Sequence, residues 1–329
     1  MWVVYFVNLH ETFKFLYMFN ISMVNKTLKK NSQKMSNKTR RVGGSLVGSL
    51  RKYLNRHKTH QFSNADLKKT VKLYKQNKKK IEKKYGKIED WDVSNVTDMT
   101  NLFKNFKKFD EPIGKWDVSN VLIMNSMFDG AEQFNHPIEE WDMSNTIYTI
   151  NMFRNAKNFN QPLGKWDMKF NKNMKFMFDG AENFNQNISG WDTSNVIEMK
   201  GLFKNAKSFN QPIGKWKTSK VTNMESMFEG AESFNQPLDK LATGSVITFK
   251  CMFKGAKEFD KPIGSWTTSN VIDMSSMFEG SEEFNQELHK WHVENVLSIK
   301  DMFLNSAFDR PLRSWNLKTM IERMTQKKV

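Results

Sequence analysis

Tryptophan recurs every 25 residues through most of this 329-residue chain, and the last step is 24 residues. Leu241 stands at the one frame position that lacks a Trp. The nine tryptophans of the frame are Trp91, Trp116, Trp141, Trp166, Trp191, Trp216, Trp266, Trp291 and Trp315. A fixed period of about 20–50 residues means that similar units stack and bury a shared core. The period therefore constrains the fold before any local pattern does.

Two rows of Phe follow the same period. Positions are counted here from the frame residue, so the first row stands at +12. It comprises Phe103, Phe128, Phe153, Phe178, Phe203, Phe228, Phe253, Phe278 and Phe303. The second row stands at +18, from Phe109 to Phe284, and ends one residue early at Phe308. The two rows predict an aromatic core shared by about nine coils.

Local patterns within one repeat predict a short strand followed by a short helix. Val196, Met199 and Phe203 are spaced as on one face of a helix, and β-branched residues precede them. Asn195 and Glu198 have the spacing of a helix capping box. The same pair recurs at Asn95 and Asp98 and at Asn270 and Asp273.

Position +14 holds only Gly or Asn, the residues that tolerate the left-handed conformation after a helix. These residues are Asn105, Gly130, Asn155, Gly180, Asn205, Gly230, Gly255, Gly280 and Asn305. We therefore expect an α/β repeat solenoid of the leucine-rich-repeat type. It would have short parallel strands, short helices, about nine 25-residue coils and an N-terminal helical cap.

Charge alternates in sign from coil to coil at positions +13 and +16. The first row runs Lys104, Asp129, Arg154, Asp179, Lys204, Glu229, Lys254 and Glu279, and the second runs Lys107, Glu132, Lys157, Glu182, Lys207, Glu232, Lys257 and Glu282. A slip by one repeat would bring like charges together, which is destabilising. The rows therefore predict stacking with equivalent positions side by side.

The net charge of +16 is not spread over the repeats. Residues 25–90 hold 21 Lys and Arg against four Asp and Glu, whereas residues 91–329 hold 29 against 30. We divide the chain into an apolar leader (1–24), a basic linker (25–63), a basic helical cap (64–87), the repeats (88–316) and a tail (317–329). The leader is interrupted by polar residues, so a membrane anchor, an interfacial helix and a translated stretch before the true start are all open.

The cap is predicted to be one helix that begins at Asn64 and ends at Gly86. Its basic residues are Lys68, Lys69, Lys72, Lys75, Lys78, Lys79, Lys80, Lys83 and Lys84. They are interpreted first as the solvated face of a cap on the first repeat. The alternative is a site for a polyanion, either nucleic acid or an anionic membrane, and the two interpretations are compatible.

An acidic row stands at position +1: Asp92, Asp117, Asp142, Asp167 and Asp192. Each Asp precedes a turn sequence, so it can accept a hydrogen bond from a nearby backbone N–H. The alternative is a partner-facing acidic strip. The single Cys251 excludes an internal disulfide, and the six His form no recurrent ligand set. We predict no catalytic residues, metal site, cofactor or small-molecule substrate.

The segments WDVSNVTDM (91–99), WDTSNV (191–196), MFDGAEQFN (127–135) and FNQPIGKW (209–216) resemble the BspA-like leucine-rich repeat proteins. They are closest to the mycoplasma-type 25-residue repeat known as DUF285. Residues 65–96 look like the N-terminal cap of members encoded by large DNA viruses of protists. The resemblance implies a surface protein that acts in binding or adhesion without catalysis.

The sequence thus predicts a non-enzymatic protein-interaction or adhesion scaffold with a protein partner. The alternative is association with nucleic acid or an anionic membrane through residues 26–85. A reducing intracellular compartment is favoured, and a membrane or surface location applies if residues 1–24 are an anchor.

Overall fold

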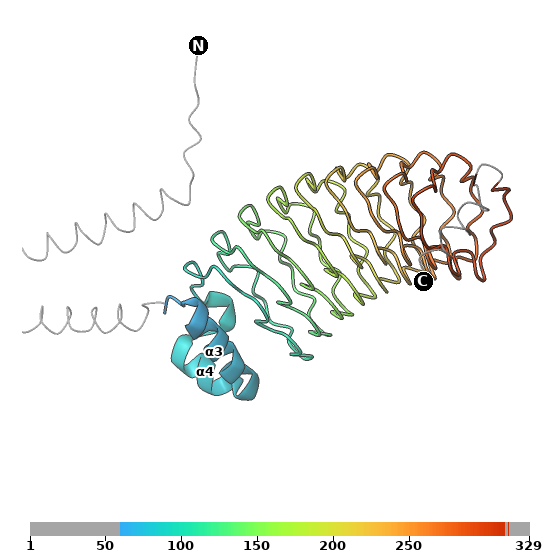
Figure 1. The fold of residues 1–329 in the computed structure, drawn as a ribbon. Coiled ribbons are helices and arrows are strands. Elements are labelled where there is room, and N and C mark those ends of the chain that lie inside the picture. The colour runs from blue at the N-terminus through green and yellow to red at the C-terminus, as the bar shows by residue number, and fades with distance from the viewer. Residues whose placement is uncertain (1–59, 313–314, 316–329) are drawn as a thin grey trace, which may run out of the picture. The chain divides into compact units, whose positions relative to one another are not determined.

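The computed structural model describes residues 60–312 and 315 (Figure 1). The chain divides into two units, Met1–Lys58 and Thr59–Val329, and the described residues belong to the second. The predicted leader (1–24), most of the linker (25–63) and the tail (317–329) lie outside the described residues.

Two α-helices precede the repeats: α3 (Asn64–Gln76) and α4 (Lys78–Tyr85), followed by the 3-10 helix η1 (Ile88–Asp90). Figure 1 shows α3 and α4 against the N-terminal end of the coils. Their apolar faces join the core through Leu67, Val71, Tyr74 and Ile81.

The single helix expected between Asn64 and Gly86 is broken at Asn77. The backbone of Asn77 ends α3, and its side chain accepts a hydrogen bond from the N–H of Lys80 and so begins α4. Ser63, not Asn64, caps α3 by accepting from Asp66 N. The side chain of Asn64 bonds to the first coil instead.

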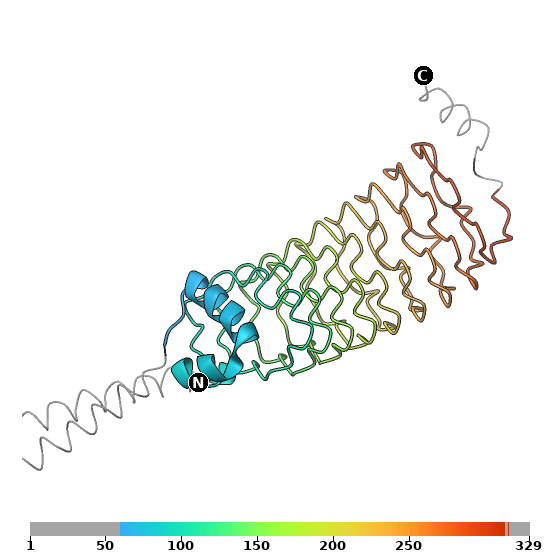
Figure 2. The same ribbon diagram turned by 90° about the horizontal axis from the view of Figure 1, so that it is seen from below.

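The repeats form stacked coils, but the predicted α/β solenoid is wrong. Within the described residues that follow η1 there is neither an α-helix nor a strand. Successive coils are joined at position +7 by isolated parallel bridges, from Asp98–Ile123 through to Asp273–Ser298. Figure 2 shows these coils lying side by side without helices between them.

Backbone hydrogen bonding explains why no helix forms. In the first coil, the N–H groups of Met99, Asn101, Phe103 and Asn105 donate to the next coil, for example Phe103 N to Met127 O at 2.8 Å. The N–H groups between them close turns within the coil, as Leu102 N does to Met99 O at 3.2 Å. An α-helix would keep all these bonds inside one segment. Here every second bond crosses to a neighbour, and later coils repeat the pattern.

This arrangement requires left-handed residues at two positions. The expected left-handed conformation at +14 is confirmed, with φ of 54° at Asn105 and 71° at Gly130, although it ends no helix. A second left-handed row at +10 was not expected. It comprises Asn101, Ser126, Asn151, Phe176, Gly201, Ser226, Cys251, Ser276 and Asp301.

The predicted capping boxes are also wrong. The Asn195 Nδ2 donates to the carbonyl of Lys169 in the preceding coil at 2.8 Å. Glu198 accepts from the N–H of Lys200 two residues later, at 2.8 Å. These side chains therefore tie coils together and fix local turns, because no helix end exists for them to cap.

The frame tryptophans are buried and stacked, as the period indicates. Trp141 and Trp166 lie nearly parallel with ring centroids 6.5 Å apart. From Trp116 on, each indole N–H also donates to the preceding coil, as Trp166 Nε1 does to Ile138 O at 3.0 Å. The two Phe rows stack beside them, for example Phe128 on Phe153 at 5.4 Å. The aromatic core that the sequence predicts is confirmed.

An amide ladder at position +19 supplements the core. Asn135 Oδ1 accepts from Asn160 N at 2.9 Å and from Gln161 Nε2 at 3.0 Å. Asn160 does the same for the next coil through Asn185 and Gln186. No role for this row was predicted from the sequence.

The alternating charges form ion pairs between neighbouring coils. Asp129 lies between Lys104 at 3.2 Å and Arg154 at 3.5 Å, and Glu182 lies between Lys157 at 3.6 Å and Lys207 at 3.2 Å. Pairs of this kind confirm that equivalent positions stack side by side.

Candidate interaction surfaces

The acidic row bonds locally. Asp92 Oδ1 accepts from the N–H and the hydroxyl of Ser94, at 3.1 and 2.6 Å. The same turn forms at Asp117, Asp142, Asp167 and Asp192, each accepting from the N–H two residues on. The local role is therefore present in all five positions. Asp117, Asp142 and Asp167 remain exposed, so a partner-facing strip stays a prediction.

Asp192 ends the acidic row at an ion pair. Hydrogen bonds from Ser194 lower the pKa of its carboxyl, and Lys217 in the next coil, 3.4 Å away, lowers it further. Lys217 replaces the Asp of the earlier coils. The acidic row thus ends at Asp192, where Lys217 at the same position of the next coil pairs with the carboxylate.

The nine cap lysines divide into two groups. Three of them bind the first coil: Lys68 pairs with Asp98 at 2.8 Å, Lys75 donates to Asn105 O at 2.8 Å, and Lys78 pairs with Glu111 at 2.6 Å. Burial raises the pKa of the Asp98 carboxyl, but hydrogen bonds from Lys68 and Thr100 outweigh it and leave that pKa lowered. These lysines serve the attachment of α3 and α4 to the repeats.

The other lysines face solvent. Lys84 lies over the ring of Tyr85, 4.6 Å from its centroid. The side chains of five lysines have no partner among the described residues: Lys69, Lys72, Lys79, Lys80 and Lys83. The structure therefore keeps part of the basic surface available to an anion.

A largely exposed apolar row at position +6 was not predicted from the sequence. It comprises Leu122, Ile147, Ile197, Ile247, Ile272 and Leu297, and this set is called the apolar row below. Ile147 and Leu297 are half-buried, and Lys172 and Thr222 interrupt the row. Backbone bonds join its neighbours, such as Ile272 N to Ile247 O at 2.8 Å. Leu122, Ile197, Ile247 and Ile272 are 41–46 % exposed. Apolar residues directly after the buried residue at +5 were the signal that could have found it.

Two further exposed side chains lie near the apolar row. Tyr148 follows Ile147, and Phe170 is 54 % exposed in the coil where Lys172 interrupts the row. In that coil the buried Asn171 replaces a Val and donates to Thr149 Oγ1 at 3.1 Å. The buried amide of Asn171 therefore has a hydrogen-bond partner within the core.

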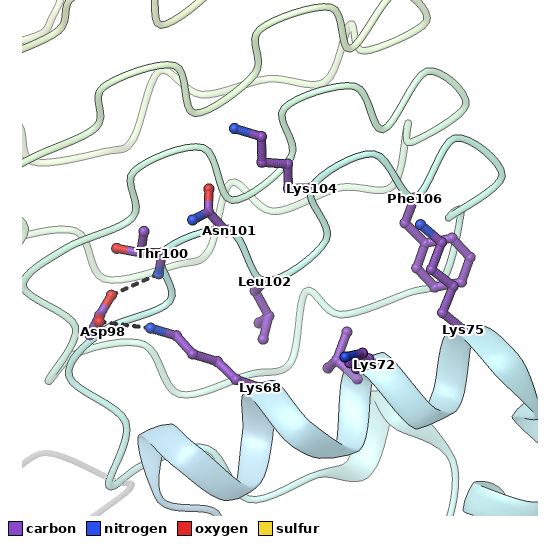
Figure 3. Close-up of a pocket in the computed structure, with 10 residues that line it drawn as sticks. Lys68, Lys72, Lys75, Asp98, Thr100, Asn101, Leu102, Lys104 and Phe106 are labelled. Carbon is purple, nitrogen blue, oxygen red and sulfur yellow. Dashed lines mark hydrogen bonds and ion pairs between the residues drawn. The ribbon is translucent and has the colours of Figure 1, made fainter.

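A groove of about 500 Å³ lies between α3 and the first coil (Figure 3). Val71 and Leu102 are buried in its lining, and Phe106 is half-buried. The Lys68–Asp98 ion pair lies at one end, and Lys75 lies beside Phe106 at the other. The groove combines apolar surface with lysines, and no sequence pattern pointed to it.

Chemically reactive side chains are dispersed. Burial raises the pKa of the half-buried Cys251 thiol, which disfavours the thiolate. Among residues 60–312 and 315, no three His, Cys, Asp or Glu side chains are grouped so that they could hold a metal ion. No helix in the described part of the chain is long and apolar enough to cross a membrane.

Comparison with known proteins gives one match. The model of a family described as "Mycoplasma protein of unknown function, DUF285" matches residues 68–178, 162–254 and 237–327. No curated protein matches the chain, and no solved structure matches it. The match covers the repeats and most of the two cap helices. The chain therefore belongs to the DUF285 family.

Proposed function

We propose that the repeats form a non-enzymatic scaffold that binds a protein partner. The apolar row is the observation that supports it most strongly. Side chains such as Ile247 and Ile272 are held next to each other on neighbouring coils, yet they are only about half covered. Contiguous exposed apolar side chains rimmed by polar ones are typical of protein-binding surfaces.

The coil architecture supports the same proposal. Each coil binds only its two neighbours, through the indole, amide and charge rows. A binding surface can therefore change at one position per coil without disturbing the core. Adhesion is one use of such a surface.

The test compares two variants of the full chain in panning against a displayed protein-fragment library. One variant replaces Leu122, Ile197, Ile247 and Ile272 by Ser, and the matched control replaces the exposed Lys115, Lys215 and Lys240 by Ser. We expect binders that the control retains and the apolar-row variant loses. Binders that survive the loss of the apolar row, or no specific binder at all, would contradict the proposal.

A second candidate function is association with nucleic acid or an anionic membrane through residues 26–85. Its support is the set of exposed, unpaired lysines Lys69, Lys79, Lys80 and Lys83. Replacing these four by Gln should weaken binding to an oligonucleotide or to phosphatidylserine vesicles and flatten its salt dependence. Equal binding by the parent chain and the variant would show that these lysines do not contribute to anion binding.

A further inference from the structure

The first coil has an edge of unpaired carbonyl groups. In each later described coil, the carbonyls at +7, +9, +11 and +13 accept N–H groups from the preceding coil, as Asn125 O does from Asn101 N at 2.9 Å. In the first coil the equivalent carbonyls accept no hydrogen bond from the described residues. They belong to Asp98, Thr100, Leu102 and Lys104. Unpaired carbonyls in such a row can accept N–H groups from another chain segment.

The four residues of this edge line the groove beside α3. Lys68 and Lys75 reach across to the first coil, and Figure 3 shows Lys72 between them along α3. Lys72 is exposed and has no partner among the described residues. The groove thus offers hydrogen-bond acceptors on one side, a free cation on the other and apolar side chains between them.

Its length sets the size of an occupant. Lys68 and Lys75 are seven residues apart on α3, or about 10.5 Å along the helix axis. An extended chain spans about 3.3 Å per residue, so roughly three residues fit between them. A volume of about 500 Å³ agrees with a segment of this size.

We propose that the groove binds a short extended acidic segment of a partner protein. Alternate residues of an extended chain face the same side, so the segment donates about two backbone N–H groups to the free carbonyls of the first coil. Its carboxylates pair with Lys72 and with Lys75, which donates only to the carbonyl of Asn105. An apolar side chain between two acidic ones lies on Leu102 and Val71. This surface is separate from the apolar row, so the proposal goes beyond the scaffold function and can fail without it.

Both chemistries are needed to select this occupant. A phosphate or a nucleic-acid backbone matches the lysines, but it has no N–H groups to donate to the carbonyl oxygens of the edge. The basic segment 25–59 of this chain has N–H groups, but it contains no Asp or Glu. An acidic peptide meets both requirements.

The first experiment measures binding of fluorescein-labelled Glu-Leu-Glu-Leu-Glu to the full chain by fluorescence anisotropy. Lys-Leu-Lys-Leu-Lys tests the charge, and a form of the acidic peptide N-methylated at alternate backbone amides tests the carbonyl edge. We expect the unmodified acidic peptide to bind, and both other peptides to bind at least tenfold more weakly, which corresponds to about 1.4 kcal/mol. Equal binding of the methylated peptide would overturn the pairing to the edge, and equal binding of the lysine peptide would overturn the charge argument.

The second experiment places the site. Lys72→Gln should lower the affinity for the acidic peptide roughly fivefold, as loss of a partly exposed ion pair predicts. The matched control is Lys69→Gln on the same helix, which removes an exposed lysine that does not line the groove and should leave affinity unchanged. Equal effects of the two substitutions would reject the groove. Octathymidylate and tripolyphosphate serve as competitors, and displacement by either one that depends on Lys72 would assign the groove to phosphate instead.

Discussion

At the scale of single residues, the missing tryptophan is compensated from another position in its own coil. Leu241 leaves space beside Trp266, and Phe249 lies against that ring with centroids 5.2 Å apart. Most other coils have Met at the position of Phe249. Both residues are buried, so the exchange keeps the core volume nearly constant.

This exchange predicts a strong coupling between the two sites. Leu241→Trp alone should overfill the core and cost about 1–3 kcal/mol. Phe249→Met alone should leave a gap, and the double variant should recover most of both losses. Urea unfolding of the three variants and the parent gives the coupling energy. Additive effects would show that Phe249 does not occupy the space of the missing indole.

Asp179 is an unusual member of the charge row. Burial raises the pKa of its carboxyl, even though Lys204 and Arg154 act in the opposite direction. Glu279, four coils later, has a lowered pKa because Lys254 donates to it at 2.8 Å. Equivalent positions therefore contribute to stability with opposite dependence on pH.

The sign of each contribution follows from the folded pKa. A raised carboxyl pKa favours the folded state below the unfolded value of about 3.9, and this advantage is lost as pH rises through the folded value. Stability of the parent relative to Asp179→Asn should therefore fall as pH rises from about 3.9. Relative to Glu279→Gln it should fall as pH drops below about 4.3. Urea midpoints check this, and the assignment would be contradicted if both stability differences changed in the same direction with pH.

At the scale of elements, a helix was predicted where the chain forms overlapping turns. Val196, Met199 and Phe203 are buried as expected. Helical spacing places such residues on one face, and consecutive turns do so as well. What decides between them is where alternate N–H groups bond, and that depends on the neighbouring coil. No single repeat contains this information, so the core residues were predictable and the backbone was not.

The left-handed row at +14 follows a steric rule between coils. A Cβ on Gly180 would lie 2.5 Å from Asn155 Oδ1 in the preceding coil, and one on Gly130 would lie 2.7 Å from Asn105 Oδ1. Each Asn therefore requires a Gly after it. Gly255 follows a Gly instead, and its nearest neighbour would be 3.8 Å away.

The rule predicts opposite outcomes at two glycines. Gly255→Asn should change the free energy of unfolding by less than about 0.5 kcal/mol, because Asn tolerates this conformation and Gly280 leaves space for it. Gly180→Asn should cost about 2 kcal/mol or more, because the side chain meets Asn155. Chemical unfolding checks both, and similar losses would mean that backbone strain rather than the neighbouring Asn decides.

At the scale of the whole repeat array, core and surface have different periods. The aromatic rows repeat every 25 residues, whereas the charge rows repeat every two coils. Ion pairs such as Arg154–Asp129 and Lys254–Glu279 form only between coils of opposite sign. Removing an odd number of coils should therefore bring like charges together, whereas removing an even number should keep opposite charges paired.

Deletion of residues 241–265 should place Glu229 next to Glu279, whereas deletion of residues 216–265 should place Lys204 next to Glu279. The one-coil deletion should therefore be stabilised by salt, and the two-coil deletion should not. Thermal melting at about 0.01 M and about 1 M NaCl tests this, because the Debye length falls from about 30 Å to about 3 Å. The same salt response in both deletions would show that the alternation does not affect stability.

Only some of the candidate interaction surfaces could be predicted from the sequence. The acidic row and the cap lysines are visible as residue types, and their local bonds follow from turn and cap chemistry. The apolar row was not predicted, because an apolar residue at +6 that directly follows a buried residue looks like part of the core. The carbonyl edge of Thr100 and Leu102 has no side-chain signature at all, since it exists only where a neighbouring coil is missing.

The crossing hydrogen bonds also give the array a mechanical character. Bonds such as Phe103 N to Met127 O run from coil to coil, so tension along the stack loads them at one junction at a time. Each coil that detaches releases 25 residues, or about 85 Å of chain. Pulled from its two ends, the protein should lengthen in equal steps at nearly constant force, and the junction at Leu241, where the indole stack is interrupted, is the natural place for the first step.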